Sequence, residues 1–167
     1  MKESPDRMVV LRTLDVNDWQ RWRLLRLQAL TESPEAFSST LADWQGEGDT
    51  EERWRQRLND VPYNAIAELN GTDVGMVSAT VPDRRGVIEL ISMWVAPTSR
   101  GTGAGDALVR SVIAWAEQQP SAKALHLCVV KESHRAIGLY ERHGFTYLDD
   151  VVDTVRGDAE SRMSLLL

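Results

Sequence analysis

VAPTSRGTGAG, the segment from Val95 to Gly105, joins an apolar run to a helical pattern. The apolar run begins at Ile88, and the helical pattern begins at Ala104. Small residues in such a turn let backbone N–H groups face outward, and the following helix adds the positive end of its dipole. Arg100 offers charge-assisted contacts at the entrance to the turn. The segment therefore predicts a strand, a phosphate-binding turn and a helix, in that order.

Length and composition favour an ordinary globular protein. The 167 residues suit one domain spanning 1–167, and hydrophobic residues make up 43% of them. Lys and Arg number 19 against 25 Asp and Glu, which leaves a net charge of −6. This balance argues against nucleic acid as a partner and favours a cationic acceptor. No apolar run reaches the length of a bilayer span, so we expect no membrane partner.

The N-terminus and the single cysteine indicate a cytoplasmic location. Residues 1–7 are polar and lack the apolar core of a signal peptide, so we expect a short disordered lead-in. One cysteine cannot form an internal disulfide. Because Cys128 stands in an apolar run, we expect a small buried core residue there.

Hydrophobic periodicity and turn residues predict the element order β-α-α-β-β-β-α-β-α-β-β. Four helices are expected. The first runs from a cap at Asp15, Asn17 or Asp18 to about 31, and the second from 49 or 50 to about 58. The third runs from 104 to 118, and the fourth from a Ser133 cap to about 143. Strands are expected at 8–14, 63–69, 74–81, 87–96, 124–130, 145–152 and 162–167, and the segment 34–48 is ambiguous. The fold class is α/β, with a mixed central sheet of six to seven strands and helices on both faces.

Local signals add detail to this order. Asn70-Gly71 marks a hairpin with a loop slightly longer than two residues. The continuous apolar run at 124–130 is typical of a strand buried on both faces. Gly144 is expected to end the last helix, and a polar turn around Arg156-Gly157-Asp158 joins the last two strands.

Two common phosphate cradles fit the segment poorly. A P-loop needs a lysine followed by Ser or Thr after its last glycine, whereas Asp106-Ala107 follows Gly105. A dinucleotide fingerprint would place its third glycine at Asp106, although Glu132 imitates the acid that binds ribose. A nicotinamide dinucleotide therefore remains only a weak alternative.

The third option is the pattern Arg100-x-x-Gly103-x-Gly105, which resembles the pyrophosphate loop of the GNAT family of N-acetyltransferases. Upstream, Val95-Ala96-Pro97 is similar to the family element that ends the central strand. Downstream, SHRAIGLYERHGF at 133–145 is similar to the family signature N-x-x-A-x-x-L-Y-x-x-x-G-F, with Ser133 in place of Asn. The resemblance covers roughly Val9 to Leu167 and implies a GNAT-like sheet.

The resemblance implies acetyl-CoA as co-substrate and no metal. Backbone N–H groups of the loop would hold the pyrophosphate, and an N–H near Val95 would polarise the thioester carbonyl. Tyr140 matches the family's general acid, and Glu89 is a candidate general base, placed by alternation on the same face as Ile91 and Met93. The implied cofactor-binding residues are Met93, Trp94, Val95, Arg100, Gly101, Thr102, Gly103, Ala104, Gly105, Ser133 and Tyr140.

The acceptor is implied only as an amine, either a small molecule or a protein. Direct transfer in a ternary complex is expected, because Cys128 has no adjacent base in the sequence. A non-catalytic acyl-CoA-binding module on the same fold is the main alternative, and a homodimer is left open. The aromatic residues of the first part are expected to be mostly core, with some lining the acceptor pocket: Trp19, Trp22, Phe37, Trp44, Trp54 and Tyr63.

Overall fold

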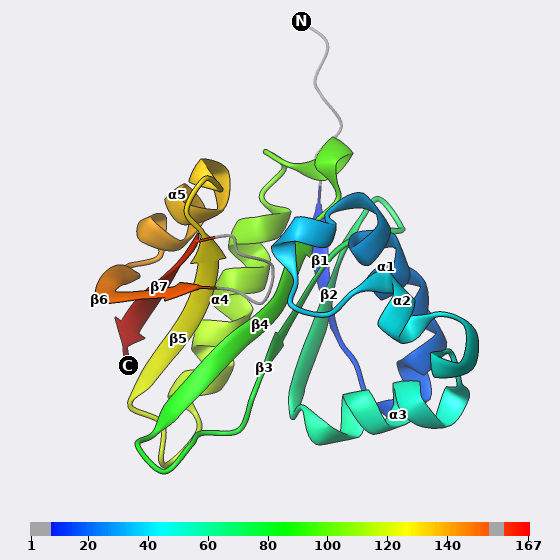
Figure 1. The fold of residues 1–167 in the computed structure, drawn as a ribbon, viewed down its shortest axis with the longest axis horizontal. Helices are drawn as coiled ribbons and strands as arrows, with labels where there is room; N and C mark the ends of the chain where they lie inside the picture. The colour runs from blue at the N-terminus through cyan, green and yellow to red at the C-terminus, as the bar shows by residue number, and fades with distance from the viewer. Residues whose placement is uncertain (1–7, 154–158) are drawn as a thin grey trace, which may run out of the picture.

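The computed structural model describes residues 8–153 and 159–167 (Figure 1). The expected lead-in at 1–7 and the turn at 156–158 lie outside the described residues.

A seven-stranded mixed sheet runs through the molecule in the order β1-β2-β3-β4-β5-β7-β6. Strands β4 and β5 are parallel, and every other neighbouring pair is antiparallel. The mixed sheet predicted from the sequence is therefore confirmed. The strands are β1 (Val9–Thr13), β2 (Tyr63–Leu69), β3 (Thr72–Ala79), β4 (Val87–Val95), β5 (Ala124–Val130), β6 (Thr146–Asp153) and β7 (Ala159–Leu166).

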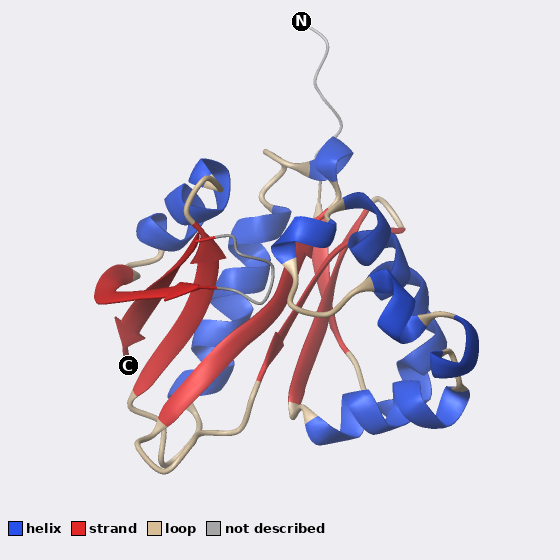
Figure 2. Ribbon diagram, viewed as in Figure 1, coloured by secondary structure: helices blue, strands red, loops and turns tan. Residues whose placement is uncertain are grey.

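Helices cover both faces of the sheet, as expected (Figure 2). Helix α4 packs behind it, and α1 and α3 pack on the opposite face. The ambiguous segment before β2 contains an additional short helix, so three helices rather than two precede β2. In the described residues, no helix combines the length and apolarity that a membrane span requires. The helices are α1 (Trp19–Glu32), α2 (Leu41–Trp44), α3 (Glu51–Asp60), α4 (Ala104–Glu117) and α5 (His134–Arg142).

Helix α2 was missed because its signal is local and short. Thr40 and Asp43 form a capping box, in which each side chain accepts a hydrogen bond from the backbone N–H of the other residue. Such a box satisfies two N–H groups that a helix start leaves unpaired. The apolar periodicity of a four-residue helix is too short to stand out.

Two hydrophobic clusters hold the layers together. Under α4, the residues Leu108, Val109 and Val112 pack against the inner strands. On the other face Trp22 and Trp54 are fully buried, and burying a large apolar side chain contributes on the order of 2–3 kcal/mol. Most of the aromatic residues expected in the core are therefore there; Trp22, Phe37, Trp54 and Tyr63 are buried, and Trp19 and Trp44 pack against them or nearby core residues.

The β2–β3 hairpin is tighter than the sequence predicted. Leu69 pairs with Thr72, so the loop contains only Asn70 and Gly71. Their φ angles of 52° and 81° are the left-handed values that a two-residue hairpin turn requires. Strand β3 begins at Thr72 rather than Val74, because the exposed Thr72 and Asp73 join the ladder without an apolar signal.

Candidate active site

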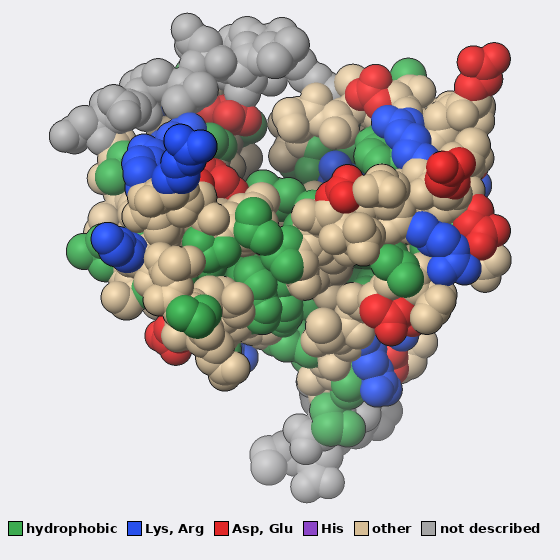
Figure 3. Space-filling model, turned by 90° about the horizontal axis from the view of Figure 1, so that it is seen from below, with side chains coloured by type: hydrophobic (Ala, Val, Ile, Leu, Met, Phe, Trp, Pro, Cys, Tyr) green, Lys and Arg blue, Asp and Glu red, His purple; other side chains and the backbone are tan. Residues whose placement is uncertain are grey.

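A cleft of about 110 Å³ opens where β4 and β5 part. The two strands pair only at Val87–Ala124, Ile88–Leu125 and Glu89–His126. Beyond Glu89 they diverge, and the cleft lies between Leu90–Met93 of β4 and Leu127–Val130 of β5. In Figure 3, a notch at the upper edge of the molecule opens on the side that faces the viewer in Figure 1.

Cys128 is exposed, which contradicts the expectation of a buried core residue. Leu125, Leu127 and Val129 point into the cluster under α4, so alternation turns Cys128 to the other face. No helix of the described chain packs there closely enough to bury β5 on both faces, so that expectation was wrong too. Desolvation still raises the pKa of the Cys128 thiol above its ordinary value, so the thiol stays protonated at neutral pH.

A β-bulge at Ser92 changes which way the end of β4 faces. Ile91 pairs with Ser78 and Trp94 pairs with Met76, so β4 has one more residue here than β3. Ser92 takes a φ of 54°, an uncommon left-handed value for serine. The bulge turns Met93 toward the α4 cluster, whereas Ile91 stays on the face of Ser78. The prediction that Glu89, Ile91 and Met93 share one face was therefore wrong for Met93.

The Trp94 side chain belongs to the core opposite α4. Its Nε1 donates a hydrogen bond to Ser33 Oγ at 3.2 Å, and the residue is 4% exposed. Only its backbone can take part in binding a cofactor in the cleft.

The backbone of Val95 faces the gap between the strands. Ala96 N donates to Val74 O at 2.7 Å, so Ala96 is paired with β3. Adjacent residues of a strand point their N–H and C=O groups to opposite edges, which turns those of Val95 toward the β5 side. On that side Arg100 Nε donates to Val95 O at 3.3 Å. The Val95 N–H thus points toward the gap between β4 and β5.

The turn after β4 forms an open cradle. Gly101 and Gly103 have φ angles of 75° and 91°, and an added Cβ at either would meet no described atom within 4 Å. The first helical hydrogen bond of α4 joins Ala107 N to Gly103 O at 3.0 Å. The N–H groups of the three residues from Ala104 to Asp106 precede that bond and have no acceptor within the helix. They can therefore donate to an anion.

Side chains around the cradle brace it. Thr102 Oγ1 donates to Ser99 O at 2.5 Å, which closes the turn. A Cβ at Gly105 would lie 3.2 Å from Leu139 Cδ2, so the missing side chain lets α4 and α5 pack closely. Arg100 is exposed beside the cradle, where its guanidinium can meet a phosphate.

Asp106 is held by α5 rather than facing the cradle alone. His143 Nε2 lies 2.8 Å from Asp106 Oδ1, and Arg142 Nη2 lies 3.3 Å from the same oxygen. Burial by itself would raise the pKa of Asp106, but the His143 hydrogen bond and the Arg142 charge outweigh it, and the pKa is lowered. The carboxylate is therefore ionised, and the positive charge of Arg142 balances its negative charge at the start of α4.

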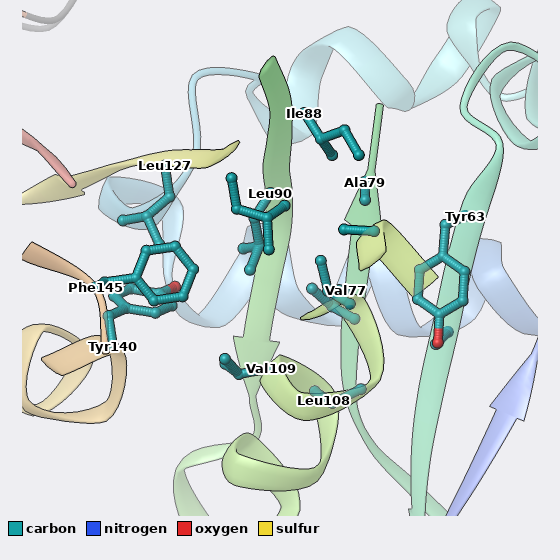
Figure 4. Packing of buried hydrophobic residues seen from close by; sticks show 14 of the residues in the cluster. Tyr63, Val77, Ala79, Ile88, Leu90, Leu108, Val109, Leu127, Tyr140 and Phe145 are labelled. Carbon is teal, nitrogen blue, oxygen red and sulfur yellow. The ribbon is translucent and has the colours of Figure 1, made fainter. Parts of the chain in front are cut away.

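Tyr140 lies on α5 and lines the cleft. Its ring makes an edge-to-face contact with Phe145, with centroids 5.8 Å apart, and Figure 4 shows both rings next to Leu127. Burial raises the pKa of the Tyr140 phenol well above its ordinary value. The phenol therefore keeps its proton at neutral pH. Gly144 ends α5 with a φ of 91°, as predicted.

Ser133 takes the N-cap position of α5 and also lines the cleft. Its side chain makes no capping hydrogen bond with the described residues, so the expected side-chain cap is not formed. Its backbone conformation, with ψ of 66°, departs from the extended geometry that such a cap prefers.

Two carboxylates stand near the cleft. Glu89 is the last β4 residue paired with β5, and it points away from α4 because Ile88 and Leu90 enter the cluster there. It is not one of the residues that line the cleft, whereas Glu160 of β7 is. Sequence reasoning missed Glu160 because it expected the last strand to begin at Arg162, whereas β7 begins at Ala159.

Residues 23–145 match the model of the acetyltransferase (GNAT) family. The chain is 28% identical over 131 residues to a mycothiol acetyltransferase from Salinispora tropica. That match covers 77% of this chain and 41% of the relative, so the chain spans about two fifths of that protein's length.

Solved structures share the fold. An acetyltransferase of the GNAT family from Streptococcus pneumoniae superposes with a TM-score of 0.78 at 22% identity, covering 96% of this chain and 99% of that one. A putative acetyltransferase from Salmonella typhimurium, solved with its cofactor acetyl-CoA, gives a TM-score of 0.75 at 20% identity, with coverage of 96% and 94%. The splayed β4–β5 pair and the glycine cradle are consistent with the family match. The chain belongs to the GNAT family of acetyltransferases.

Proposed function

We propose that this protein is an acetyl-CoA-dependent N-acetyltransferase that moves the acetyl group directly to a primary amine. The observation that carries the proposal is that two features lie along the same strand, β4. The cradle from Gly101 to Gly105 opens at the end of β4, and the cleft beside β4 is lined by the buried phenol of Tyr140.

The residues fit acetyl-CoA as co-substrate. The open left-handed glycines and the start of α4 suit a pyrophosphate, and Arg100 adds a positive charge beside them. The unpaired β4 edge from Met93 to Val95 offers main-chain groups to an extended pantetheine arm. Ser133, which precedes α5, and Tyr140 of α5 line the same cleft. Bound acetyl-CoA would supply the acetyl thioester. The solved Salmonella relative that holds acetyl-CoA supports this co-substrate.

Three groups of this chain have suitable chemistry for the transfer. The Val95 N–H, facing the gap, would donate to the oxygen that becomes negative during attack on a thioester. Tyr140 holds a proton at its phenol oxygen, because burial raises its pKa, and would give that proton to the departing sulfur. A carboxylate near the cleft, Glu160 or Glu89, would accept the proton that the acceptor ammonium must lose.

Tyr140→Phe tests the assignment. Loss of a general acid slows turnover about 100-fold or more, whereas CoA binding should be unchanged because the ring and its Phe145 contact remain. Thiol release from acetyl-CoA would be measured against protein N-termini, lysines, polyamines and aminoglycosides. CoA affinity would be measured by calorimetry.

The exposed Tyr147 of β6 provides a matched control. Tyr147→Phe should retain full turnover with the same amines. Absence of turnover by the wild-type protein across the panel, together with tight CoA binding, would favour the non-catalytic binding module instead. Full turnover by Tyr140→Phe would refute the role of Tyr140.

A further inference from the structure

One buried arginine, Arg26, and one partly buried arginine, Arg57, lie on the face of the sheet opposite α4. Arg26 comes from the inner face of α1 and is 7% exposed. Its guanidinium lies 4.4 Å from the centre of the Phe37 ring, and its Nη1 is buried without a hydrogen-bond partner in the described chain. A buried guanidinium nitrogen without a hydrogen-bond partner loses its hydration, and the contact of the guanidinium with the Phe37 ring returns only part of that cost.

Arg57 of α3 stands close to Arg26, and its side-chain hydrogen-bond partners are all neutral. Its Nη1 donates to Asn64 Oδ1 at 3.0 Å, and its Nη2 donates to Ser78 Oγ at 3.1 Å and to Ser92 Oγ at 3.3 Å. Burial, together with the charge of Arg57, lowers the pKa of Arg26 to about 10. Burial lowers the pKa of Arg57 to about 10, against the opposing charge of Asp60. Both are still cationic at neutral pH.

Three other arginines of α1 and α3 form ion pairs with carboxylates. Arg21 binds Asp73 at 2.5 Å and also Glu68, Arg23 binds Asp49 at 2.5 Å, and Arg55 binds Glu51 at 2.9 Å. Among residues 8–153 and 159–167, no carboxylate forms a salt bridge with Arg26 or Arg57. The buried Arg26 and the partly buried Arg57 therefore lack a direct ion-pair partner, which is costly unless a ligand supplies one.

Arg57 contacts a residue that lines the cleft, and Arg26 contacts a residue next to one that does. Ser92, which accepts from Arg57, lines the cleft at the β4 bulge. Ala36 also lines it, and the next residue is Phe37, under the Arg26 guanidinium. The glycine cradle belongs to α4 on the other face of the sheet, so CoA phosphates held there are separate from this arginine pair.

We propose that Arg26 and Arg57 form an anion subsite for the acceptor, and that the acceptor is an amine that also carries a carboxylate, as a free amino acid does. The proposal rests on the N-acetyltransferase function proposed above and specifies its acceptor class. A guanidinium fork matches the two oxygens of a carboxylate, and the Arg26 nitrogen without a partner is the donor that such a group would use. The subsite would orient the amine end of the acceptor toward Glu160 and the reacting carbonyl.

An acceptor series that varies only the anionic group tests the proposal. Thiol release from acetyl-CoA would be compared for free amino acids, their α-amides and the corresponding decarboxylated amines. We expect kcat/KM for the best amino acid to exceed that of its amide about 100-fold, because the amide leaves the buried charges unpaired. Glucosamine 6-phosphate against glucosamine separates a phosphate from a carboxylate as the anion. Amides or amines that react as well as the acids would overturn the subsite while leaving the N-acetyltransferase function intact, and so would a preference for the phosphate over every carboxylate.

Variants of the pair add a second measurement. Arg26→Met should abolish the preference for acid over amide, whereas Arg26→Lys should keep part of that preference. Arg110→Gln changes an exposed position of α4 and should keep the whole preference. Without ligand, Arg26→Met should raise Tm by about 2–4 °C, because an uncompensated buried charge is removed. A lower Tm with the acid preference unchanged would show Arg26 to be a structural partner of Phe37 and overturn the proposal.

Binding distinguishes failure of the subsite from failure of the enzyme assignment. If the wild-type protein consumes no amine, thermal shifts of the CoA-loaded protein with free amino acids still report on the arginines. Stabilisation of wild type but not of Arg26→Met would support the subsite alone. No stabilisation of either protein would overturn it.

Discussion

Gly103→Ala tests two properties of the cradle at one residue: its left-handed backbone and the open space beside it. Gly103 has a φ of 91°, and a left-handed backbone costs an L-residue roughly 1–2 kcal/mol. The added Cβ would meet no described atom within 4 Å, so no steric cost from the protein itself is added. For a chain of this size, 1 kcal/mol shifts Tm by about 2–4 °C, so Tm should fall by about 2–8 °C.

The effect on CoA comes from where that methyl group projects. It would occupy the open side of the cradle and move a phosphate away from the N–H groups at the start of α4. One charge-assisted hydrogen bond contributes about 1.5–3 kcal/mol, so the Kd for CoA should rise by about 10- to 150-fold. Calorimetric titration of CoA at a temperature well below both Tm values measures this directly.

Gly138→Ala is the matched control. Gly138 also has open space around its missing Cβ, but it lies within α5 at an ordinary helical φ. The same chemical change there should raise helix stability by up to about 1 kcal/mol and leave CoA affinity unchanged. Wild-type affinity in a folded Gly103→Ala protein would refute the cradle as the pyrophosphate site.

Two further predictions concern carboxylates. Glu160→Gln should lower kcat about 100-fold and remove the acid limb of the pH–rate profile, because Glu160 lines the cleft; loss of that limb in Glu89→Gln instead would restore the base predicted from the sequence. Asp49 bonds to Arg23 and Trp54, which lower its pKa from 3.8 to about 2. Because the folded pKa is the lower one, its stabilisation is present above about pH 4 and lost as the pH falls toward 2. Urea unfolding should therefore be less pH-dependent over that window in Asp49→Asn, and an equal dependence would contradict the pairing.

Much of the fold was predictable because its signals are local. Helix α4 and strand β5 begin where apolar periodicity and turn residues placed them. The left-handed glycines of the cradle, and Gly144 after α5, follow from the conformational freedom that only glycine has. The pattern shared with the GNAT family then predicted that the cradle and Tyr140, about thirty-five residues away in sequence, serve one site.

The face of each side chain along β4 and β5 was less predictable. Strict alternation predicts one face for Ile91 and Met93, but the bulge at Ser92 adds a residue and separates them. Apolar composition predicts a buried Cys128, but no helix of the described chain covers its face of β5, which leaves it exposed. Both outcomes depend on what packs beside or over a strand, which single-strand patterns do not contain.

The sequence by itself determined the strand–turn–helix cradle, the order of most elements and the identity of a proton-bearing tyrosine, because each depends on residues close in the chain. Tertiary structure alone decided where the proposed acceptor subsite lies. Arg26 occupies a core-facing position of α1, between the buried Trp22 and Leu30, although a charged residue ordinarily predicts exposure. Its proximity to Arg57 arises only when α3 packs against α1. Burial, the partners of a charge and the opening of a cleft are properties of packed elements, and they exist only once distant segments meet.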